Sequence, residues 1–422
     1  MLGNTKKGVR ILSHTLSSKG EEERLNMIYL DNNATTAIDK KVLEEMLPYL
    51  SEEYANPSSM YDFAKKPASA IREARVKVRD FFGANNEKEI YFTSCGSESA
   101  NMAIKGILNC NKEKRHIITT KVEHPCVLNT YKWFEKQGYE VDYIGVNSQG
   151  ELETEELKEK LRKDTALVSV MWANNETGVI HPVEEIAEYV KSKSPETRVF
   201  VDGVQAGGKL IMNVKNTQID AVGVSGHKFH APKGIGALYV KPDVRLTPLI
   251  NGGHQERGMR AGTENVPYIV GMGKAAELAM ENMDYELTEV KRLRDKLEAG
   301  ILQKVFNARL NTSITNRVPN TTNIGFEYVE GELILLHLSD IGVCASSGSA
   351  CTSGSLEPSH VLRAMGIPFT ALHGSIRFSL SRFTKEKDID YVIENMPKIM
   401  DKLTTISPFQ EELKELRKRK GF

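Results

Sequence analysis

The stretch of sequence that points most clearly to chemistry surrounds a single cysteine, Cys351. Residues 345–355 read Ala-Ser-Ser-Gly-Ser-Ala-Cys-Thr-Ser-Gly-Ser, so nearly every neighbour is small or carries a hydroxyl group. Such a segment buries little apolar area, and packing cannot offset the conformational entropy lost when it is ordered. A Gly/Ser-rich segment is also flexible enough to carry a thiol between two places. The composition therefore predicts a mobile loop that holds a nucleophilic cysteine.

A lysine at the end of a predicted strand is the second candidate. Lys228 follows Ser225, Gly226 and His227 and precedes a Pro-Lys-Gly turn. A lysine in this position can be desolvated and can act as a Schiff-base amine. Taken alone, an ordinary surface lysine is the commoner explanation.

A carboxylate and an anion-binding turn accompany this lysine. Asp202 comes directly after an apolar strand, although a lone aspartate there is more often a helix cap or a turn residue. Residues 92–99 predict a strand, a glycine-containing turn and a helix start. Free backbone N–H groups and the helix dipole at such a start suit a phosphate, and an ordinary helix cap gives the same pattern.

Together these three features match the needs of one cofactor, pyridoxal phosphate. This cofactor requires a lysine for its aldehyde, an acid that keeps its pyridine nitrogen protonated, and a site for its phosphate. The combination is far more specific than any single member of it.

The elements that position these residues alternate regularly between residues 90 and 240. The sequence predicts strands at 90–93, 116–119, 141–144, 166–171, 198–202, 221–225 and 236–240, and helices at 97–108, 127–137, 154–162 and 183–192. This alternation predicts an α/β fold with a mixed, mostly parallel sheet covered on both faces.

A smaller α/β unit is predicted to follow. A long charged helix at 273–305 leads to strands at 322–328 and 375–379 and to helices at 331–338, 359–365 and 388–403. With 422 residues, two domains are expected. We expect a large cofactor-binding domain at 27–283, whose residues 27–36 can pack on the small domain, and a small domain at 284–422 that carries Cys351. Residues 1–26 are expected to be a disordered extension, or to precede a true translation start at Met27.

Composition excludes several other classes of function. Lysine plus arginine equals aspartate plus glutamate at 56 each, which argues against nucleic acid as a partner. No apolar run approaches the roughly 20 residues of a membrane helix. The five cysteines are scattered and form no Cys-x-x-Cys pair, so neither a disulfide framework nor a zinc site is expected. A cytoplasmic protein is the expectation.

The chain resembles the pyridoxal-phosphate-dependent cysteine desulfurases of the NifS/IscS family, and most closely the NifS branch. The resemblance covers residues 28 to about 407 and implies the aminotransferase class V fold, a fold type I arrangement. It rests on motifs found in order at residues 29–36, 123–125, 174–178, 225–228, 252–258, 260–263 and 346–351.

The resemblance implies roles around the cofactor ring. Lys228 would bind the cofactor aldehyde and move the substrate Cα proton, and Asp202 would pair with the pyridine nitrogen. Gln205 would bond the phenolic oxygen. His124 would stack on the ring and assist proton transfer, although a histidine at a helix start can also be satisfied locally.

The resemblance implies a phosphate site as well. Gly96, Ser97, Ser225 and His227 would hold the phosphate, and Thr263 would reach it from a partner subunit of a homodimer. Many relatives read Gly-Ala-Thr where this chain reads Cys95-Gly96-Ser97, but Ser97 keeps the hydroxyl group. No role is assigned to Cys95.

Two further residues are implied to position the substrate. Asn175 would contact the cofactor and the substrate, and Arg377 would bind the substrate carboxylate. Arg377 lies in an apolar strand where its charge must be paired, and its planar fork suits a carboxylate. A structural ion pair is the alternative.

The implied reaction removes sulfur from L-cysteine and leaves L-alanine and a persulfide on Cys351. The sulfur would go to an iron–sulfur scaffold or another acceptor protein, nitrogenase assembly being one destination. Cys351 would then be a transient iron–sulfur ligand through its persulfide. A selenocysteine lyase, an aminotransferase and a non-catalytic sulfur-relay protein remain as alternatives. The basic end at 417–420 is either a solvated helix terminus or a docking site for an acidic acceptor.

Overall fold

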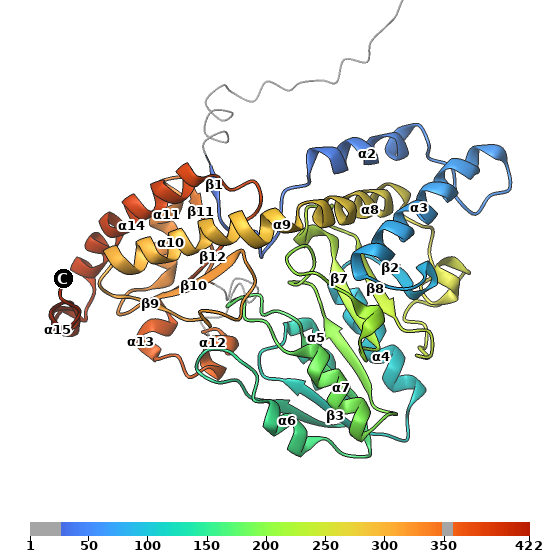
Figure 1. Ribbon diagram of the computed structural model, residues 1–422, viewed down its shortest axis with the longest axis horizontal. Coiled ribbons are helices and arrows are strands. Elements are labelled where there is room, and N and C mark those ends of the chain that lie inside the picture. The colour runs from blue at the N-terminus through green and yellow to red at the C-terminus, as the bar shows by residue number, and fades with distance from the viewer. Residues whose placement is uncertain (1–26, 348–357) are drawn as a thin grey trace, which may run out of the picture.

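Seven strands form the sheet that carries the predicted chemistry (Figure 1). The computed structural model describes residues 27–347 and 358–422. The sheet order is β2-β8-β7-β6-β5-β3-β4, and β8 alone runs antiparallel to its neighbours. The strands are β2 (Ile90–Thr93), β3 (His116–Thr120), β4 (Glu140–Ile144), β5 (Thr165–Met171), β6 (Arg198–Asp202), β7 (Ala221–Ser225) and β8 (Gly236–Val240). The predicted mixed, mostly parallel sheet is confirmed.

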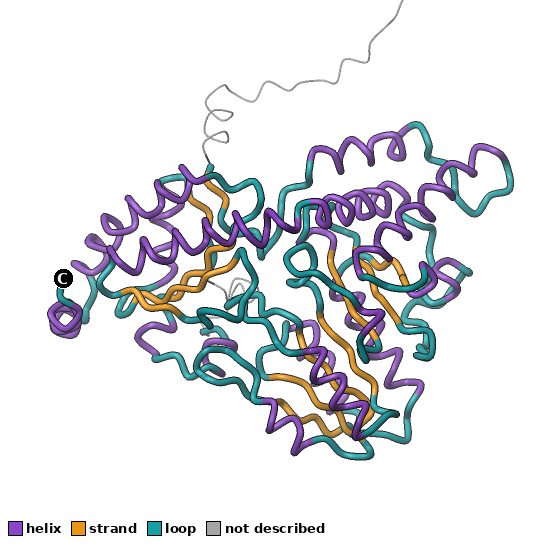
Figure 2. Tube along the Cα trace, viewed as in Figure 1, coloured by secondary structure: helices purple, strands orange, loops and turns teal. Residues whose placement is uncertain are grey.

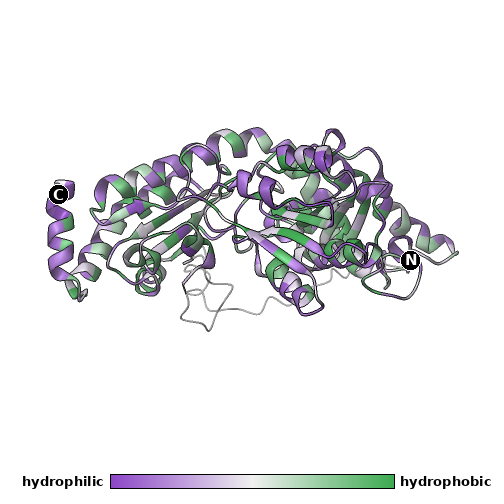
Figure 3. Ribbon diagram, turned by 90° about the horizontal axis from the view of Figure 1, so that it is seen from below, coloured by the Kyte–Doolittle hydropathy of each residue, from purple (hydrophilic) through white to green (hydrophobic). Residues whose placement is uncertain are grey.

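Helices cover both faces of this sheet, as Figure 2 shows by secondary structure. Successive strand residues point to opposite faces, so Ile117 packs with the core under α4 and α5, and Ile118 packs with the core under α3, α7 and α8. Both faces of the strands are therefore apolar, and Figure 3 colours much of the strand ribbon as hydrophobic. The helices are α3 (Lys65–Phe82), α4 (Gly96–Cys110), α5 (Pro125–Glu135), α6 (Thr154–Lys160), α7 (Val183–Lys193) and α8 (Val266–Glu281).

A second, smaller sheet lies in the C-terminal part of the chain. Strands β9 (Ala308–Leu310), β10 (Thr321–Phe326) and β12 (Ser375–Ser379) form an antiparallel sheet in the order β12-β10-β9. Its helices are α10 (Lys291–Lys304), α11 (Gly331–Asp340), α12 (His360–Ala364), α13 (Phe369–Leu372), α14 (Glu386–Ile406) and α15 (Gln410–Lys420). A separate apolar core joins α10, α11 and α14 to this sheet.

The first described residues lie against this second unit. Strand β1 (Ile28–Tyr29) pairs in parallel with β11 (Val343–Cys344), and Leu30 is fully buried in the core of the smaller sheet. The segment that follows β1 then returns toward the large sheet, since the Thr36 amide donates to the His227 carbonyl oxygen at 2.9 Å.

The long helix predicted at 273–305 is wrong as a single element. α8 begins earlier, at Val266, and ends at Glu281, because the Asn282 side chain donates to the Leu278 carbonyl oxygen at 2.7 Å. A short helix α9 (Met283–Tyr285) and a π-helical turn (Glu286–Val290) lead into α10.

Within the ranges that the structure describes, four α-helices lie where the sequence predicted none, one of them α13. Besides α3 and α15 they include α2 (Lys40–Ser51), which contains Pro48. A proline inside a helix usually signals its end, but α2 tolerates it within its last turn.

Among the described residues, no helix combines the length and apolar character needed to cross a membrane. The predictions for residues 1–26 and for the segment around Cys351 fall outside the described residues.

Candidate active site

A cavity of about 290 Å³ opens at the carboxyl ends of the parallel strands. Asp202 ends β6 and Ser225 ends β7, while His124 and Asn175 follow β3 and β5. Ligand sites of α/β sheets lie at this edge. The structure brings these predicted residues together with Gly96, Ser97, Gln205, His227, Lys228 and Arg377.

Lys228 enters the cavity from the short turn after β7. Its Nζ donates to the carbonyl oxygens of Asn33 at 2.6 Å and Ala34 at 2.8 Å, which holds the amine against the 31–36 segment. The turn requires Gly226, because a Cβ there would lie 2.9 Å from the side chains of both Ala231 and Ile235. The amine is thus an ordered part of the cavity wall.

Asp202 and His124 form the interior wall. Asp202 is buried and accepts from the Val204 amide at 3.0 Å. Burial raises the pKa of Asp202, while nearby His124 and Lys228 act in the opposite sense. A positively charged group placed against this carboxylate is therefore strongly favoured.

His124 has a structural role and also faces the cavity. It is the N-cap of α5, where Nδ1 accepts from the Cys126 amide at 3.2 Å. Burial lowers its pKa, although Asp202 raises it. An accepting Nδ1 places the proton of the neutral ring on Nε2. The helix-start alternative and a role in the cavity are thus compatible.

The start of α4 forms an anion cradle. Gly96 is its first residue, and a Cβ there would lie 2.7 Å from Val204 Cγ2 and 3.3 Å from Ser225 Cβ. Ser225 Oγ is buried and has no hydrogen-bond partner among the described residues. The helix N-terminus and this unused hydroxyl fit a phosphate. With Asp202 and Lys228, the residues present fit pyridoxal phosphate.

His227 lies at the same corner. Its Nδ1 is 3.2 Å from Thr35 Oγ1, and burial together with Lys228 lowers its pKa to about 4. The ring is therefore neutral near pH 7 and offers a hydrogen bond rather than a charge.

Arg377 shows the predicted pairing and retains an unused donor. It is buried in β12, where its guanidinium donates to Asp31 Oδ1 at 2.6 Å and to the Asn175 carbonyl oxygen at 2.9 Å. Its Nε is buried without a partner among the described residues. The ion pair is thus present, and the same guanidinium still lines the cavity.

The backbone of Arg377 also fixes the start of the cysteine-bearing segment. Ser346 and Arg377 exchange two backbone hydrogen bonds, at 3.2 and 2.6 Å. Ser346 is thereby held beside Arg377, which lines the cavity. Cys351 itself lies outside the described residues.

Thr263 is the one predicted residue within the described ranges that the cavity does not include. It is exposed and lines a separate cavity of about 260 Å³ beside Ser94 and Arg260. Within this one chain it does not meet the other site residues.

Other residues that line the cavity were not predicted. They include Asn33 and Ala34, whose motif at 29–36 had been recognised without a role, and Cys126, Met171, Ala173 and Val204. Burial raises the pKa of Cys126 well above its usual value, so its thiol stays protonated. Cys95 also lines the cavity.

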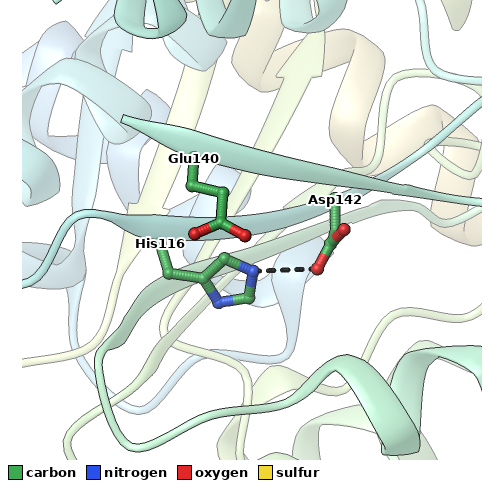
Figure 4. A group of neighbouring side chains, drawn as sticks. All are labelled: His116, Glu140 and Asp142. Atoms are coloured by element: carbon green, nitrogen blue, oxygen red, sulfur yellow. Dashed lines mark hydrogen bonds and ion pairs between the residues drawn. The ribbon is translucent and has the colours of Figure 1, made fainter. Parts of the chain in front are cut away.

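A separate cluster of ionisable groups lies at the amino-terminal ends of the strands, on the side of the sheet away from the cavity. His116 begins β3 there and Glu140 begins β4 (Figure 4). His116 Nε2 is 3.1 Å from Asp142 Oδ2. Glu140 is paired with both guanidinium nitrogens of Arg162, at 2.8 and 2.9 Å, and Asp142 faces Lys160 at 3.4 Å. Because both carboxylates are already paired with cations, this is an ion-pair network.

Comparison with known proteins agrees with this geometry. Residues 28–392 match the Aminotransferase class-V family. A cysteine desulfurase from Nostoc sp. is 57% identical over 389 residues, which cover 92% of this chain and 96% of the relative. Cysteine desulfurase NifS from Azotobacter vinelandii is 50% identical and covers 90% and 94% of the two chains.

A solved structure of a NifS-like protein superposes with a TM-score of 0.84. It is 39% identical, and the match covers 89% of this chain and all of the solved one. Relatives this similar over nearly their whole length, with the cavity above, establish the family. The chain belongs to the aminotransferase class-V family and, within it, to the pyridoxal-phosphate-dependent cysteine desulfurases.

Proposed function

We propose that this enzyme transfers the sulfur of L-cysteine to Cys351 and releases L-alanine. The observation that carries the proposal is the double hydrogen bond between Ser346 and Arg377, which starts the cysteine-bearing segment at the edge of the cavity. Cys351 follows Ser346 by five residues in the sequence.

Residues of this chain account for cofactor binding. Gly96, Ser97, Ser225 and His227, which all line the cavity, would hold the phosphate, and Asp202 would hold the protonated ring nitrogen. Bound pyridoxal phosphate supplies an electron sink for the charge left when the substrate loses its Cα proton. Lys228 would bind the cofactor aldehyde and would carry that proton at Nζ.

Gln205, His124 and Asn175 orient the ring and the substrate. Nε2 of Gln205 faces the cavity wall, where it donates to the Asn33 carbonyl oxygen at 3.1 Å. His124 would offer its Nε2–H to the bound cofactor or substrate, since its Nδ1 already accepts from the Cys126 amide. Arg377 binds the substrate carboxylate through its guanidinium, the geometry for which a planar fork is suited.

The sulfur transfer is a displacement at the substrate sulfur. The Cys351 thiolate attacks that sulfur, a sulfur–sulfur bond forms as the carbon–sulfur bond breaks, and protonation of the carbon skeleton gives L-alanine. Burial raises the pKa of both Cys126 and Cys344, which makes either thiol a poor nucleophile at neutral pH.

The working form is a homodimer in which Thr263 completes the phosphate site of the partner subunit. Its exposure outside the cavity of its own chain supports this. α2 also exposes Leu43, Leu47 and Leu50 on one face, an apolar surface suited to a second copy.

We also propose a division into a large domain at 27–283 and a small one at 284–422. The helix break at Asn282 and the separate core around α10 and α14 support this boundary. The pairing of β1 with β11 supports packing of residues 27–36 on the small domain.

The enzyme is cytoplasmic and passes its persulfide sulfur to an iron–sulfur scaffold, and Cys351 serves transiently as a cluster ligand.

The experiment measures alanine and sulfide released from L-cysteine with excess dithiothreitol. Wild type should release equal amounts of both, and Cys351→Ser should release neither while keeping its bound cofactor. Cys110→Ser, a change at an exposed cysteine at the end of α4, is the matched control. Normal alanine release by Cys351→Ser would overturn the proposal.

A further inference from the structure

A buried lysine that no proposed step uses lies directly behind the cofactor cavity. Lys209 is 5% exposed, and its Nζ lies 2.7 Å from Oε1 of Gln205. It follows Gly208, whose φ of 73° is left-handed and where a Cβ would lie 2.7 Å from Phe229 Cβ. This glycine turns the chain so that Lys209 folds back toward Gln205.

The Gln205 amide is held by two partners of opposite kind. A lysine ammonium has only donors, so the amide atom that faces Lys209 must be the oxygen. The Asn33 carbonyl oxygen only accepts, so the atom 3.1 Å from it must be the nitrogen. The two constraints agree, and they leave the second N–H of Gln205 as the hydrogen bond it can offer to a ligand in the cavity.

We infer that Lys209 is a positioning residue that orients the Gln205 amide so that it donates to, and does not accept from, the phenolic oxygen of the cofactor. The inference rests on the proposed contact between Gln205 and that oxygen. Without Lys209, Gln205 Oε1 would be a buried acceptor lacking its partner, and rotation of the amide that turns this oxygen toward a hydrogen-bond donor in the cavity would then be favoured.

The surroundings of Lys209 suggest a competing, purely structural role. Buried Glu286 lies close enough to favour its charged form, and Lys228 and Arg377 oppose that form. Burial lowers the pKa of Lys209 to about 7. A neutral amine can accept as well as donate, but the Asn33 carbonyl oxygen can only accept, so the Gln205 oxygen still faces Lys209 when the amine is neutral. The alternative is that Lys209 only neutralises Glu286 in the core.

A double-mutant cycle separates the two roles. The readouts are the pH midpoint of the visible absorbance band of the holoenzyme and the dissociation constant of pyridoxal phosphate from the apoenzyme. A donor at the phenolic oxygen stabilises its negative charge, so loss of that donor should raise the midpoint. Gln205→Met should raise it by about one pH unit. Lys209→Met should raise it in the same direction by at least half as much, and Lys209→Arg, which keeps the donor, should restore it.

The double variant Lys209→Met with Gln205→Met decides the question. If Lys209 acts through Gln205, the double variant matches Gln205→Met alone in both readouts. Additive shifts, or an unchanged midpoint in Lys209→Met, would overturn the inference. Lys209→Ala is made in parallel in case the methionine does not fold. A wild type with no visible band would instead contradict the proposed function, so the two failures are distinguishable.

Discussion

Arg377, which lines the cavity, forms an ion pair with the partly buried Asp31, with 2.6 Å between the guanidinium nitrogen and Oδ1. The guanidinium also bonds the Asn175 carbonyl oxygen, and its Nε remains without a partner among the described residues. A single arginine thus ties β12 to the segment after β1 and retains a donor for the proposed contact with the substrate carboxylate.

Arg377→Ala should raise KM for L-cysteine by about 10- to 100-fold, because a charge-assisted hydrogen bond to the carboxylate is lost. Steady-state kinetics on the cofactor-loaded enzyme measure this. Asp31→Asn is the matched control, since it weakens the ion pair but keeps the guanidinium. If the pair is only structural, both variants should lose stability and neither should change KM.

Gly96→Ala should weaken the binding of pyridoxal phosphate by about tenfold or more, because the new methyl group would lie 2.7 Å from Val204 Cγ2 within the anion cradle. Titration of the apoenzyme measures the dissociation constant. Gly145→Ala serves as the control, because its Cβ would meet nothing closer than 3.4 Å. If the two variants bound pyridoxal phosphate with equal affinity, Gly96 would not be part of the phosphate site.

A charge on the apolar surface of α2 should separate the proposed dimer. Leu47→Asp should shift the mass measured by light scattering from two chains toward one and weaken cofactor retention, because Thr263 of a partner is then missing. Leu336→Asp, at an equally exposed leucine on α11, should leave the dimer intact. A monomeric wild type with full cofactor occupancy would contradict the assembly.

The apoenzyme should lose stability as the pH falls from about 6.5 to 4. Burial lowers the pKa of His181 to about 4, and neither ring nitrogen has a partner among the described residues. As the pH falls below 6.5, His181 takes up a proton in the unfolded chain but stays neutral in the folded chain. The free energy of unfolding is therefore highest above pH 6.5 and decreases as the pH falls toward 4. The shift corresponds to about 3 kcal/mol in the free energy of unfolding. Denaturant unfolding of wild type and His181→Met at pH 7 and pH 5 tests this; equal pH slopes would exclude His181.

Local pattern was enough to predict the elements that hold the reactive residues. Buried β-branched strands place Asp202 and Ser225 at their ends, and the sheet direction brings both to one edge. The break at Asn282 was not predicted, because a single side-chain bond to Leu278 ends a helix whose apolar pattern continues. α2 was not predicted, because a proline such as Pro48 usually marks the end of a helix.

The site was predicted less completely than the sheet, for a physical reason. Lys209 reaches Gln205 only through the left-handed turn at Gly208, and no spacing rule reveals that contact. Asn33 enters the cavity because β1 pairs with β11, more than 300 residues away in sequence. Thr263 requires a second chain in the proposed assembly, so no single chain can place it.

The most direct test of the account is the location of the sulfur after one turnover. The enzyme is mixed with L-cysteine without reductant, alkylated, digested and examined by mass spectrometry. We predict one added sulfur atom at Cys351, and none at Cys95, Cys126 or Cys344. No lysine or arginine separates Cys344 from Cys351, so fragment ions within their shared peptide assign the sulfur to one of the two. Added sulfur on one of those three with an unmodified Cys351, accompanied by normal alanine release, would contradict it.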